Sequence, residues 1–326
     1  MNAKRLTLMV FVLLCAFSAV AAENFRVHKT ILITLPSEPG KSETATAYCN
    51  DAVSIILPED KTFIQGIEIS IKVPQVVVEW RDSVAWSIYK DISPRPTEKK
   101  IDYKGTRIHT GTYGISLRKT IQIPLVNPNT IKRDSYSEYL PLDLTVDEEQ
   151  IFFRMQLAMK GASDDIPQKP FEITVRPLLI DKGRFVLNTE SPDGKESEAY
   201  TLFIDGKSVS GSDMLLDTGT HTVSLVSDSY RNEVRTINIT QGATTDLSIR
   251  FRDITPQILI ASPDSATVFI DGQEVANPKE PYPVQQGDHM VKFVIGDYEV
   301  VKQVSAVNGR SYTVAVSIDA EISESE

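Results

Sequence analysis

The sequence predicts an all-β protein, in which a β-sandwich-like N-terminal domain is followed by two small tandem β-sandwich or barrel modules. Apolar and polar side chains alternate along much of the chain, which is typical of strands with one buried face. After residue 22, no stretch of ten or more residues has its apolar side chains at the spacing of a helix. The C-terminal part repeats a unit of roughly 70 residues. The 326 residues, 41% apolar and 24% charged, also fit a folded chain of about two domains.

The strands of the N-terminal domain are predicted from two kinds of apolar pattern. Every second side chain is apolar in residues 67–73 and 171–176, which predicts strands with one face in a core. Two continuous apolar runs, 31–33 and 76–78, predict strands that are buried on both faces. Proline and asparagine at residues 125–129 interrupt the pattern, so we expect a loop there.

The first 22 residues have the features of a cleavable export signal. Two basic residues near the start precede an apolar run over residues 6–20, which ends in small residues up to Ala22. This order is typical of secretory signals and predicts an exported chain, located in the periplasm or at the cell surface. An uncleaved membrane anchor and a lipoprotein modified at Cys15 are the alternatives. No later segment is long enough to span a membrane, so we expect no transmembrane segment in the mature chain.

The net charge argues against one class of partner, and the cysteine content argues against a reactive thiol. The formal net charge is −10, which argues against nucleic acid as a partner because phosphate binding requires a concentrated positive surface. After removal of the signal, Cys49 is the only cysteine. It has no basic neighbour in sequence to stabilise a thiolate, so we expect a buried, inert thiol.

The C-terminal part contains two copies of one unit. Residues 202–209 return as 268–275 at an offset of 66, and later positions return at offsets of 67 or 68. The first copy also has a five-residue insertion, which we place within residues 195–200. The predicted organisation is a signal at 1–22, an N-terminal domain at 23–180, repeats at 181–253 and 254–320, and an acidic tail at 321–326.

Each repeat has turn residues at matching positions. Asp-Gly after an apolar strand favours a tight hairpin, because glycine accepts a positive φ and aspartate bonds to its own backbone. A second glycine precedes the long strand of each copy. Two histidines, His221 and His289, occupy equivalent positions, which indicates a repeated structural role. The turn positions to which we assign structural roles are Asp205, Gly206, Gly219, Asp271, Gly272 and Gly287.

The start of the second repeat carries a family motif. Pro263-Asp264-Ser265-Ala266 precedes a strand that ends in Ile270-Asp271-Gly272. This resembles the PEGA domain family, named for a Pro-Glu-Gly-Ala motif before a strand ending in Ile-Asp-Gly. Asp264 and Ser265 depart from the motif, and the first copy is more divergent because its insertion displaces the alanine. The resemblance implies compact, non-catalytic β modules, mostly of exported or surface-associated bacterial and archaeal proteins, and implies no ligand.

Motifs that would indicate catalysis are missing from the sequence. It contains no Gly-x-Ser-x-Gly, no phosphate-binding glycine loop and no paired cysteine or His-Glu-x-x-His spacing for zinc. Residues 143–149 and 210–213 contain side chains with oxygen atoms that could bind calcium, but neither stretch has the spacing of an EF-hand loop. We therefore expect no enzyme, no catalytic residues, no cofactor and no metal.

Three aromatic residues of the N-terminal domain are candidates for a binding surface. Trp80 and Trp86 are six residues apart, so on one unbroken strand they would share a face, and Tyr89 lies close in sequence. Exposed rings of this kind stack on sugars or anchor protein partners. A turn at residues 81–83, or burial of the rings in the core, is the competing interpretation.

These features together predict a non-catalytic cell-envelope protein. The N-terminal domain would recognise another envelope protein, and the PEGA-like modules would act as spacer or docking units. A protein that binds peptidoglycan or surface glycan through Trp80, Trp86 and Tyr89 is the first alternative, and it requires those rings to be exposed. A periplasmic hydrolase with convergent carboxylates in a deep pocket of residues 23–178 is the second.

Overall fold

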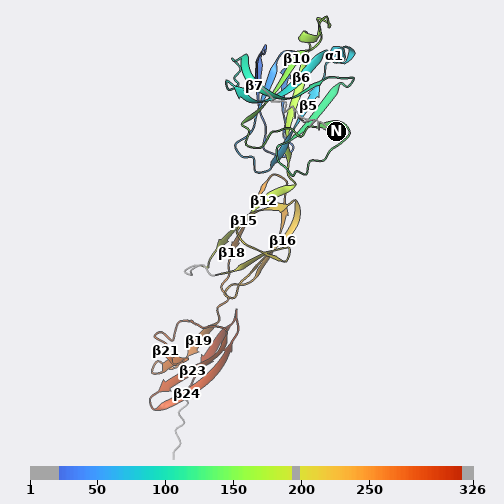
Figure 1. Ribbon diagram of the computed structural model, residues 1–326. Coiled ribbons are helices and arrows are strands. Elements are labelled where there is room, and N and C mark those ends of the chain that lie inside the picture. The colour runs from blue at the N-terminus through green and yellow to red at the C-terminus, as the bar shows by residue number, and fades with distance from the viewer. Residues whose placement is uncertain (1–21, 193–198, 318–326) are drawn as a thin grey trace, which may run out of the picture. The chain divides into compact units, whose positions relative to one another are not determined.

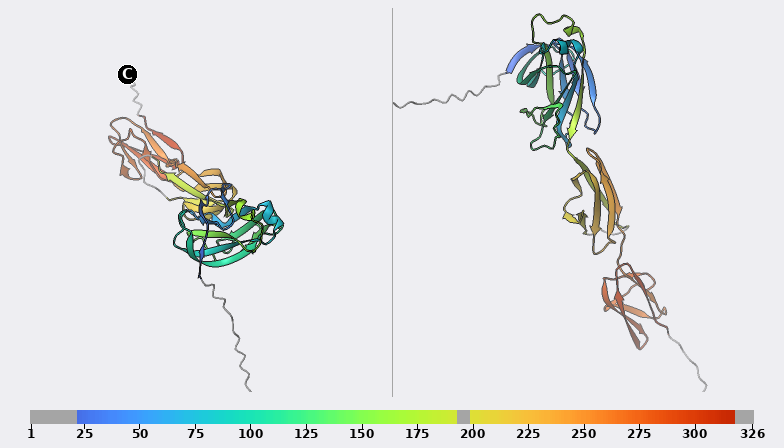
Figure 2. Two further views of the ribbon diagram at one scale, coloured as in Figure 1. Left: turned by 90° about the horizontal axis from the view of Figure 1, so that it is seen from above. Right: turned by 90° about the vertical axis from the view of Figure 1, so that its right-hand side faces the viewer.

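A computed structural model describes residues 22–192 and 199–317 of the chain (Figure 1). The structure is almost entirely β, which confirms the predicted fold class. The chain divides into two compact units, Met1–Lys182 (unit 1) and Gly183–Glu326 (unit 2), and Figure 2 gives further views of them. The export signal before Ala22, most of the insertion and the acidic tail lie outside the described residues. No helix in the described ranges combines the length and apolar character needed to cross a membrane.

Unit 1 is a sandwich of two sheets. One sheet has the strand order β1-β7-β6-β10-β4-β2 and the other has the order β3-β11-β5-β8-β9. The strands of the first sheet are β1 (Ala22–Arg26), β2 (Thr30–Thr34), β4 (Ala52–Ile56), β6 (Val84–Ser93), β7 (Asp102–Thr112) and β10 (Gln150–Leu157). Those of the second are β3 (Glu43–Ala47), β5 (Ile64–Lys72), β8 (Arg118–Pro124), β9 (Ser137–Tyr139) and β11 (Phe171–Leu179). Two short helices, α1 (Gln75–Glu79) and the 3-10 helix Ile166–Gln168, lie in connections.

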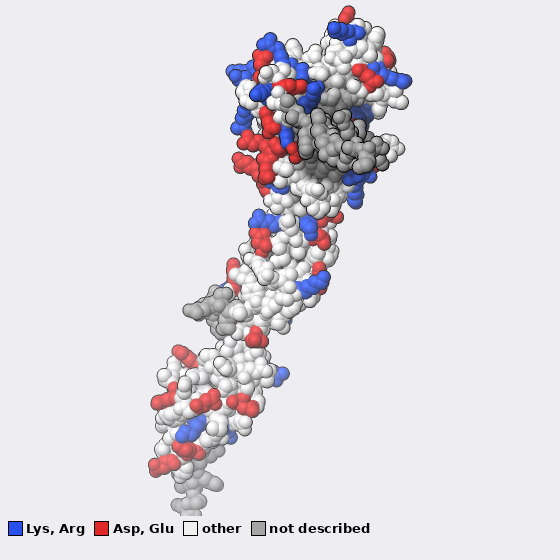
Figure 3. Space-filling model, in the orientation of Figure 1, with Lys and Arg blue, Asp and Glu red and all other residues white. Residues whose placement is uncertain are grey.

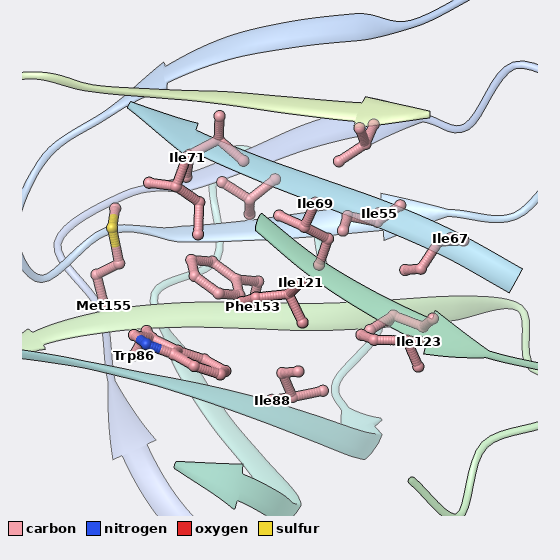
Figure 4. Packing of buried hydrophobic residues seen from close by; sticks show 14 of the residues in the cluster. Ile55, Ile67, Ile69, Ile71, Trp86, Ile88, Ile121, Ile123, Phe153 and Met155 are labelled. Carbon is pink, nitrogen blue, oxygen red and sulfur yellow. The ribbon is translucent and has the colours of Figure 1, made fainter. Parts of the chain in front are cut away.

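The core of unit 1 lies between the two sheets. Alternate residues of β5 and β8, such as Ile69 and Ile121, face Trp86 and Phe153 from the other sheet (Figure 4). The rings of Trp86 and Phe153 are stacked, with 5.9 Å between their centroids. Each of these side chains is completely buried, so the period-two pattern of the sequence corresponds to this inner face.

Two of the predicted buried strands are wrong in detail. Residues 76–78 belong to α1 and not to a strand, and only Val77 of the helix is buried. The chain leaves one sheet at this point, so an extended segment would have no neighbouring strand, whereas a helical turn satisfies its own backbone. Trp80 N, for example, donates to Val76 O at 3.0 Å. Residues 31–33 do form a strand, but β2 is at the edge of its sheet and Leu32 is 36% exposed.

Unit 2 contains two modules with the same topology. Module 1 consists of β12 to β18 and module 2 of β19 to β25, and each pairs a three-stranded sheet with a four-stranded sheet. The first and last strands of each module, β12 with β18 and β19 with β25, pair in parallel. The strands of module 1 are β12 (Lys182–Glu190), β13 (Thr201–Ile204), β14 (Lys207–Val209), β15 (Asp213–Asp217), β16 (Gly219–Val226), β17 (Glu233–Ile239) and β18 (Thr244–Arg250). Those of module 2 are β19 (Gln257–Ala261), β20 (Thr267–Ile270), β21 (Gln273–Glu274), β22 (Tyr282–Pro283), β23 (Gly287–Ile295), β24 (Tyr298–Ala306) and β25 (Ser311–Ala315).

Each module has its own hydrophobic cluster, but one aligned pair of residues differs in environment. Phe185 and Val223 are at the centre of the first cluster, and Val291 and Phe293 at the centre of the second. Tyr230 is buried and stacks on Phe251 with 4.5 Å between ring centroids, whereas Tyr298 is 77% exposed. The connection between β16 and β17 is longer than that between β23 and β24, so residues matched in sequence do not share a place in the turn.

We expect Gly111→Ala to destabilise unit 1 by about 1–3 kcal/mol, because a Cβ at this position would overpack the core. A Cβ built on Gly111 lies 2.5 Å from Cζ2 of Trp86, which is itself completely buried. The matched control is Gly114→Ala, since a Cβ there meets no atom within 4 Å. Denaturant unfolding of both variants measures the difference, and equal stabilities would contradict this account of the packing.

Candidate functional site

One end of unit 1 is formed by four connections that cross from one sheet to the other. They are residues 48–51, 73–83, 113–117 and 158–170, and we call this surface the crossover end. The strand registers place them together, since Lys72 pairs with Arg118 and with Glu172, and Leu157 pairs with Val84. Helix α1 marks the crossover end in Figure 1.

Hydrogen bonds join neighbouring crossovers into one surface. Asp82 N donates to Tyr113 O at 3.1 Å, which connects residues 73–83 with 113–117. Ala158 N donates to Ser83 O at 2.8 Å and extends the link to the third crossover. Residues 48–51 are connected to the end of β10, because Leu157 N donates to Asn50 Oδ1 at 3.3 Å. These bonds link the crossovers to one another or to the adjoining end of β10.

Every crossover carries an exposed large apolar or aromatic side chain. Ile115 is the most exposed of them at 68%, and Leu117 in the same crossover is 52% exposed. The others are Tyr48, Trp80 and Met159, with Leu157 at the end of β10 directly beside them. Exposed apolar side chains that gather at one end of a domain are a common feature of interaction sites.

A cavity of about 430 Å³ opens beside Leu117. Its residues come from three of the crossovers and from the adjoining ends of the second sheet. The apolar residues lining it include Val73, Pro74, Leu117, Pro170 and Phe171, with Lys72 and Glu172 on its polar side. Lys72 and Glu172 approach each other at 3.6 Å, so their charges are paired. The cavity is therefore suited to an apolar side chain rather than to a charged group.

The charges of the crossover end do not form a positive surface. Five acidic residues and three basic residues occur in the four crossovers: Asp51, Glu79, Asp82, Asp164 and Asp165 against Arg81, Lys160 and Lys169. The face of unit 1 visible in Figure 3 likewise carries both signs of charge. An anionic partner would gain no general electrostatic attraction here.

The three aromatic residues predicted as a binding surface do not lie together at the surface. Trp80 follows α1 and is 42% exposed, whereas Trp86 and Tyr89 on β6 are completely buried. The turn at residues 81–83 separates Trp80 from the strand that contains Trp86. The even spacing of the two tryptophans therefore does not place them on one face. A platform of stacked rings for a glycan, which required all three to be exposed, is therefore wrong.

Tyr89 belongs to a smaller aromatic cluster on the outer face of the first sheet. It packs with Phe25, Tyr103 and Phe152, because the chain around Val27 crosses over this face. Its hydroxyl donates to Glu23 Oε1 at 2.7 Å. Burial and this carboxylate together raise the pKa of the Tyr89 hydroxyl. The role of Tyr89 is to hold β1 against the sheet.

Cys49 is buried in the core directly below the crossover end, as its sequence surroundings predicted. Burial raises the pKa of its thiol to about 11. Tyr113, from the neighbouring crossover, is 1% exposed. A thiol that stays protonated and covered is a poor nucleophile.

Three cavities in the described part of unit 1 do not bring carboxylates together. Glu172 is the only carboxylate among the residues that line the cavity beside Leu117. Asp102 is the only one in a second cavity of about 520 Å³ near Phe25, and a third of about 590 Å³ near Tyr139 is lined by none. Within the part of the chain that the structure describes, no group of His, Cys, Asp and Glu is arranged to hold a metal ion. In the two stretches considered for calcium, 143–149 and 210–213, Asp143 pairs with Lys90 and Asp213 with Arg184.

The repeat turns have the backbone that their residues favour. Asp205 and Gly206 have φ of 51° and 77°, and the equivalent pair in module 2 has φ of 50° and 83°. Both residues of each turn are thus left-handed, as a two-residue hairpin requires. Gly219 and Gly287, at the starts of β16 and β23, also have positive φ.

Sequence reasoning identified Trp80 but missed most of the crossover end. Ile115 and Leu117 lie in a five-residue segment without charged residues, and such a segment resembles the end of a buried strand. The available signal was its place between two alternating strands, since apolar residues in a connection are more often exposed than those in a strand. Met159 and Tyr48 gave no such signal.

We expect acrylamide to quench the fluorescence of Trp80 and to leave that of Trp86 nearly unaffected. Trp80 is 42% exposed, whereas Trp86 is covered from all sides. A Trp80→Phe variant should therefore lose the accessible component of the emission. Quenching that remains strong in this variant would show that Trp86 is accessible and would contradict the core described above.

We expect Cys49 to resist alkylation in the folded protein at neutral pH. Its thiol is 4% exposed and its pKa is about 11, so the thiolate fraction and the access of the reagent are both low. Iodoacetamide labelling followed by mass spectrometry measures this, with the urea-unfolded chain as the reactive control. Equal labelling rates in both states would contradict it.

Comparisons with known proteins do not assign the chain to a family. No family model matches it, and a search of curated proteins finds no match. Among solved structures, the Bacillus anthracis TIE protein is similar at a TM-score of 0.30 and 10% identity, over 86% of this chain and 58% of that chain. The pilus adhesin SpaC of Lactobacillus rhamnosus GG is similar at a TM-score of 0.23 and 7% identity, over 90% of this chain and 42% of that chain. This chain therefore spans less than two thirds of either structure.

Proposed function

We propose that this chain is an exported, non-catalytic cell-envelope protein that recognises another envelope protein through the crossover end of unit 1. The two modules of unit 2 would belong to the PEGA family and act as spacer or docking units. The observation that carries the proposal is the crossover end itself, where four connections each present an exposed apolar or aromatic side chain and a cavity opens beside one of them, Leu117.

The chemistry of this surface favours a protein partner that supplies an apolar anchor. Interfaces between proteins are typically centred on one or a few large side chains that enter a pocket of the partner. The cavity beside Leu117, with Pro74 and Phe171 in its wall, offers such a pocket. The balance of charge toward acidic residues favours a partner segment that is neutral or weakly basic.

Support for the role of unit 2 comes from its repetition. Each module closes its own small core around Phe185 or Phe293, and both retain the same strand order. Repeated modules with separate cores are a common way to extend a chain without adding a new site. The export signal and the PEGA resemblance of the sequence support a location in the cell envelope.

We expect Ile115→Ser combined with Leu117→Ser to weaken partner binding by about tenfold or more, because Leu117 lines the cavity and Ile115 is the most exposed apolar side chain of the crossover end. The partner is first captured from envelope extract by the mature chain with a crosslinker and identified by mass spectrometry. Its purified form is then titrated against the wild type and the double variant. Binding that is unchanged in the double variant would contradict the proposal.

The matched control for this experiment is Val301→Ser. Val301 lies on β24 of module 2 and is 52% exposed, as Leu117 is, so this change removes a similar exposed side chain away from the crossover end. Thermal unfolding of each variant establishes that the fold is retained. Capture of the same partner by residues 181–326 alone would move recognition to the PEGA-like modules.

A further inference from the structure

Both modules of unit 2 place a histidine at the centre of the same hydrogen-bond network. In module 1, Nδ1 of His221 lies 2.7 Å from Oδ2 of Asp205, in the Asp-Gly turn. Its Nε2 lies 2.8 Å from the backbone oxygen of Asp217, at the end of β15. The other carboxylate oxygen of Asp205 accepts from Thr222 N at 2.9 Å. The ring thus connects the turn, the start of β16 and the segment that precedes it.

Module 2 repeats this arrangement with different neighbours. Nδ1 of His289 lies 2.7 Å from Oδ2 of Asp271, and its Nε2 lies 2.7 Å from the backbone oxygen of Gln285. Met290 N donates to the second carboxylate oxygen of Asp271 at 2.9 Å. Gln285 replaces Asp217, yet the contact is kept because it uses a backbone oxygen.

The partners of both rings favour the doubly protonated form. A carboxylate oxygen and a backbone carbonyl oxygen can only accept hydrogen bonds. Each ring nitrogen of His221 and His289 faces one of these oxygens at hydrogen-bond distance, so both contacts are hydrogen bonds only when both nitrogens carry a proton. The side chains of His221 and His289 are only 14% and 12% exposed, so water has little access to replace either contact. The network is therefore complete only with an imidazolium.

The carboxylates around the two rings also favour the protonated form. Asp205 faces His221 from the turn and Asp217 from β15, while Asp271 and Asp288 surround His289. Lys207 beside Asp205 is the basic group of the turn in module 1. The cross-strand neighbours of the two histidines, Ile237 on β17 and Val304 on β24, carry no charge.

The hydrogen bonds to these carboxylates raise the pKa of both histidines above 6.5. The pKa of each partner carboxyl is lowered below 3.8 in turn. The backbone bond from Thr222 N is the first cause for Asp205, and the bond from the His289 ring is the first cause for Asp271.

We propose that each module contains a proton-dependent clamp, in which an imidazolium holds the segment before its long strand against the Asp-Gly turn and releases that segment when the ring loses a proton. A neutral ring can donate to only one of its two oxygens. The bond to the charged carboxylate is the stronger of the two, so the ring keeps its proton on Nδ1. The contact that is lost is the one to the backbone oxygen of Asp217 or Gln285.

The direction of the pH dependence follows from the two groups. A raised histidine pKa in the folded state means that its stabilisation is complete below about pH 6.5 and is lost as the pH rises through the folded value. A lowered aspartate pKa means that its stabilisation is present above about pH 3.8 and is lost as the pH falls through the folded value. The clamp is therefore firmest in mildly acidic solution. It is independent of the crossover end of unit 1.

The protonation state is tested by ¹⁵N NMR of the histidine rings in the full chain, assigned with the variants His221→Asn and His289→Asn. We expect both rings to show two protonated nitrogens in mildly acidic solution and to titrate above the value of the same histidines in the urea-unfolded chain. A neutral tautomer near pH 6.5, or titration at or below the unfolded value, would overturn the proposal.

Release of the segment is tested by hydrogen exchange with mass spectrometry on peptides that cover residues 213–222 and 281–290. After correction for intrinsic rates, we expect the opening of these peptides to rise as the pH increases from about 6.5 to 8.5, by up to about tenfold for each unit of pKa shift. This rise should vanish in the His221→Asn, His289→Asn double variant and persist in the control His28→Asn, which changes a histidine of unit 1. A rise that is equal in all three proteins would refute the clamp.

Discussion

The packing of the two sheets of unit 1 against each other is the constraint on which its surface depends. Facing sheets lie about 10 Å apart, so a connection from one to the other must span that distance across the end of the core. Side chains on the inner side of the span are covered, as Cys49 and Tyr113 are, and those on the outer side are in solvent, as Trp80 and Ile115 are. Four such spans side by side produce the crossover end.

The modules of unit 2 have less apolar surface to stabilise them, because small β units bury little of it. Their cores are centred on a few residues, such as Phe185 and Phe293, and the turns at the module edge have little core beneath them. A charged hydrogen-bond network around His221 or His289 then connects the Asp-Gly turn to the segment before the long strand. Asp205 and Asp271 serve both the left-handed turn and the histidine, which explains why turn and histidine recur together in the two copies.

Local patterns predicted the elements better than they predicted their surroundings. Alternation at residues 67–73 corresponds to β5, and the Asp-Gly pairs form hairpins, because both depend on neighbours in sequence. The valines at 76–78 were misread because their strand preference is weak compared with the lack of a pairing partner between two sheets. Of the candidate binding residues, Trp80 alone is exposed, since neither spacing nor residue type shows which segments cover Trp86 and Tyr89.

The sequence by itself determined that the chain is all-β, that its C-terminal part is a repeated unit, and where the tight turns lie. These properties follow from the period of the side chains and from the backbone freedom of glycine, which act over a few residues. Only the tertiary structure decided which apolar residues remain at the surface and which ring nitrogens meet an oxygen. Burial and hydrogen-bond partners depend on segments that are distant in sequence, as Leu117 and Phe171 beside one cavity show.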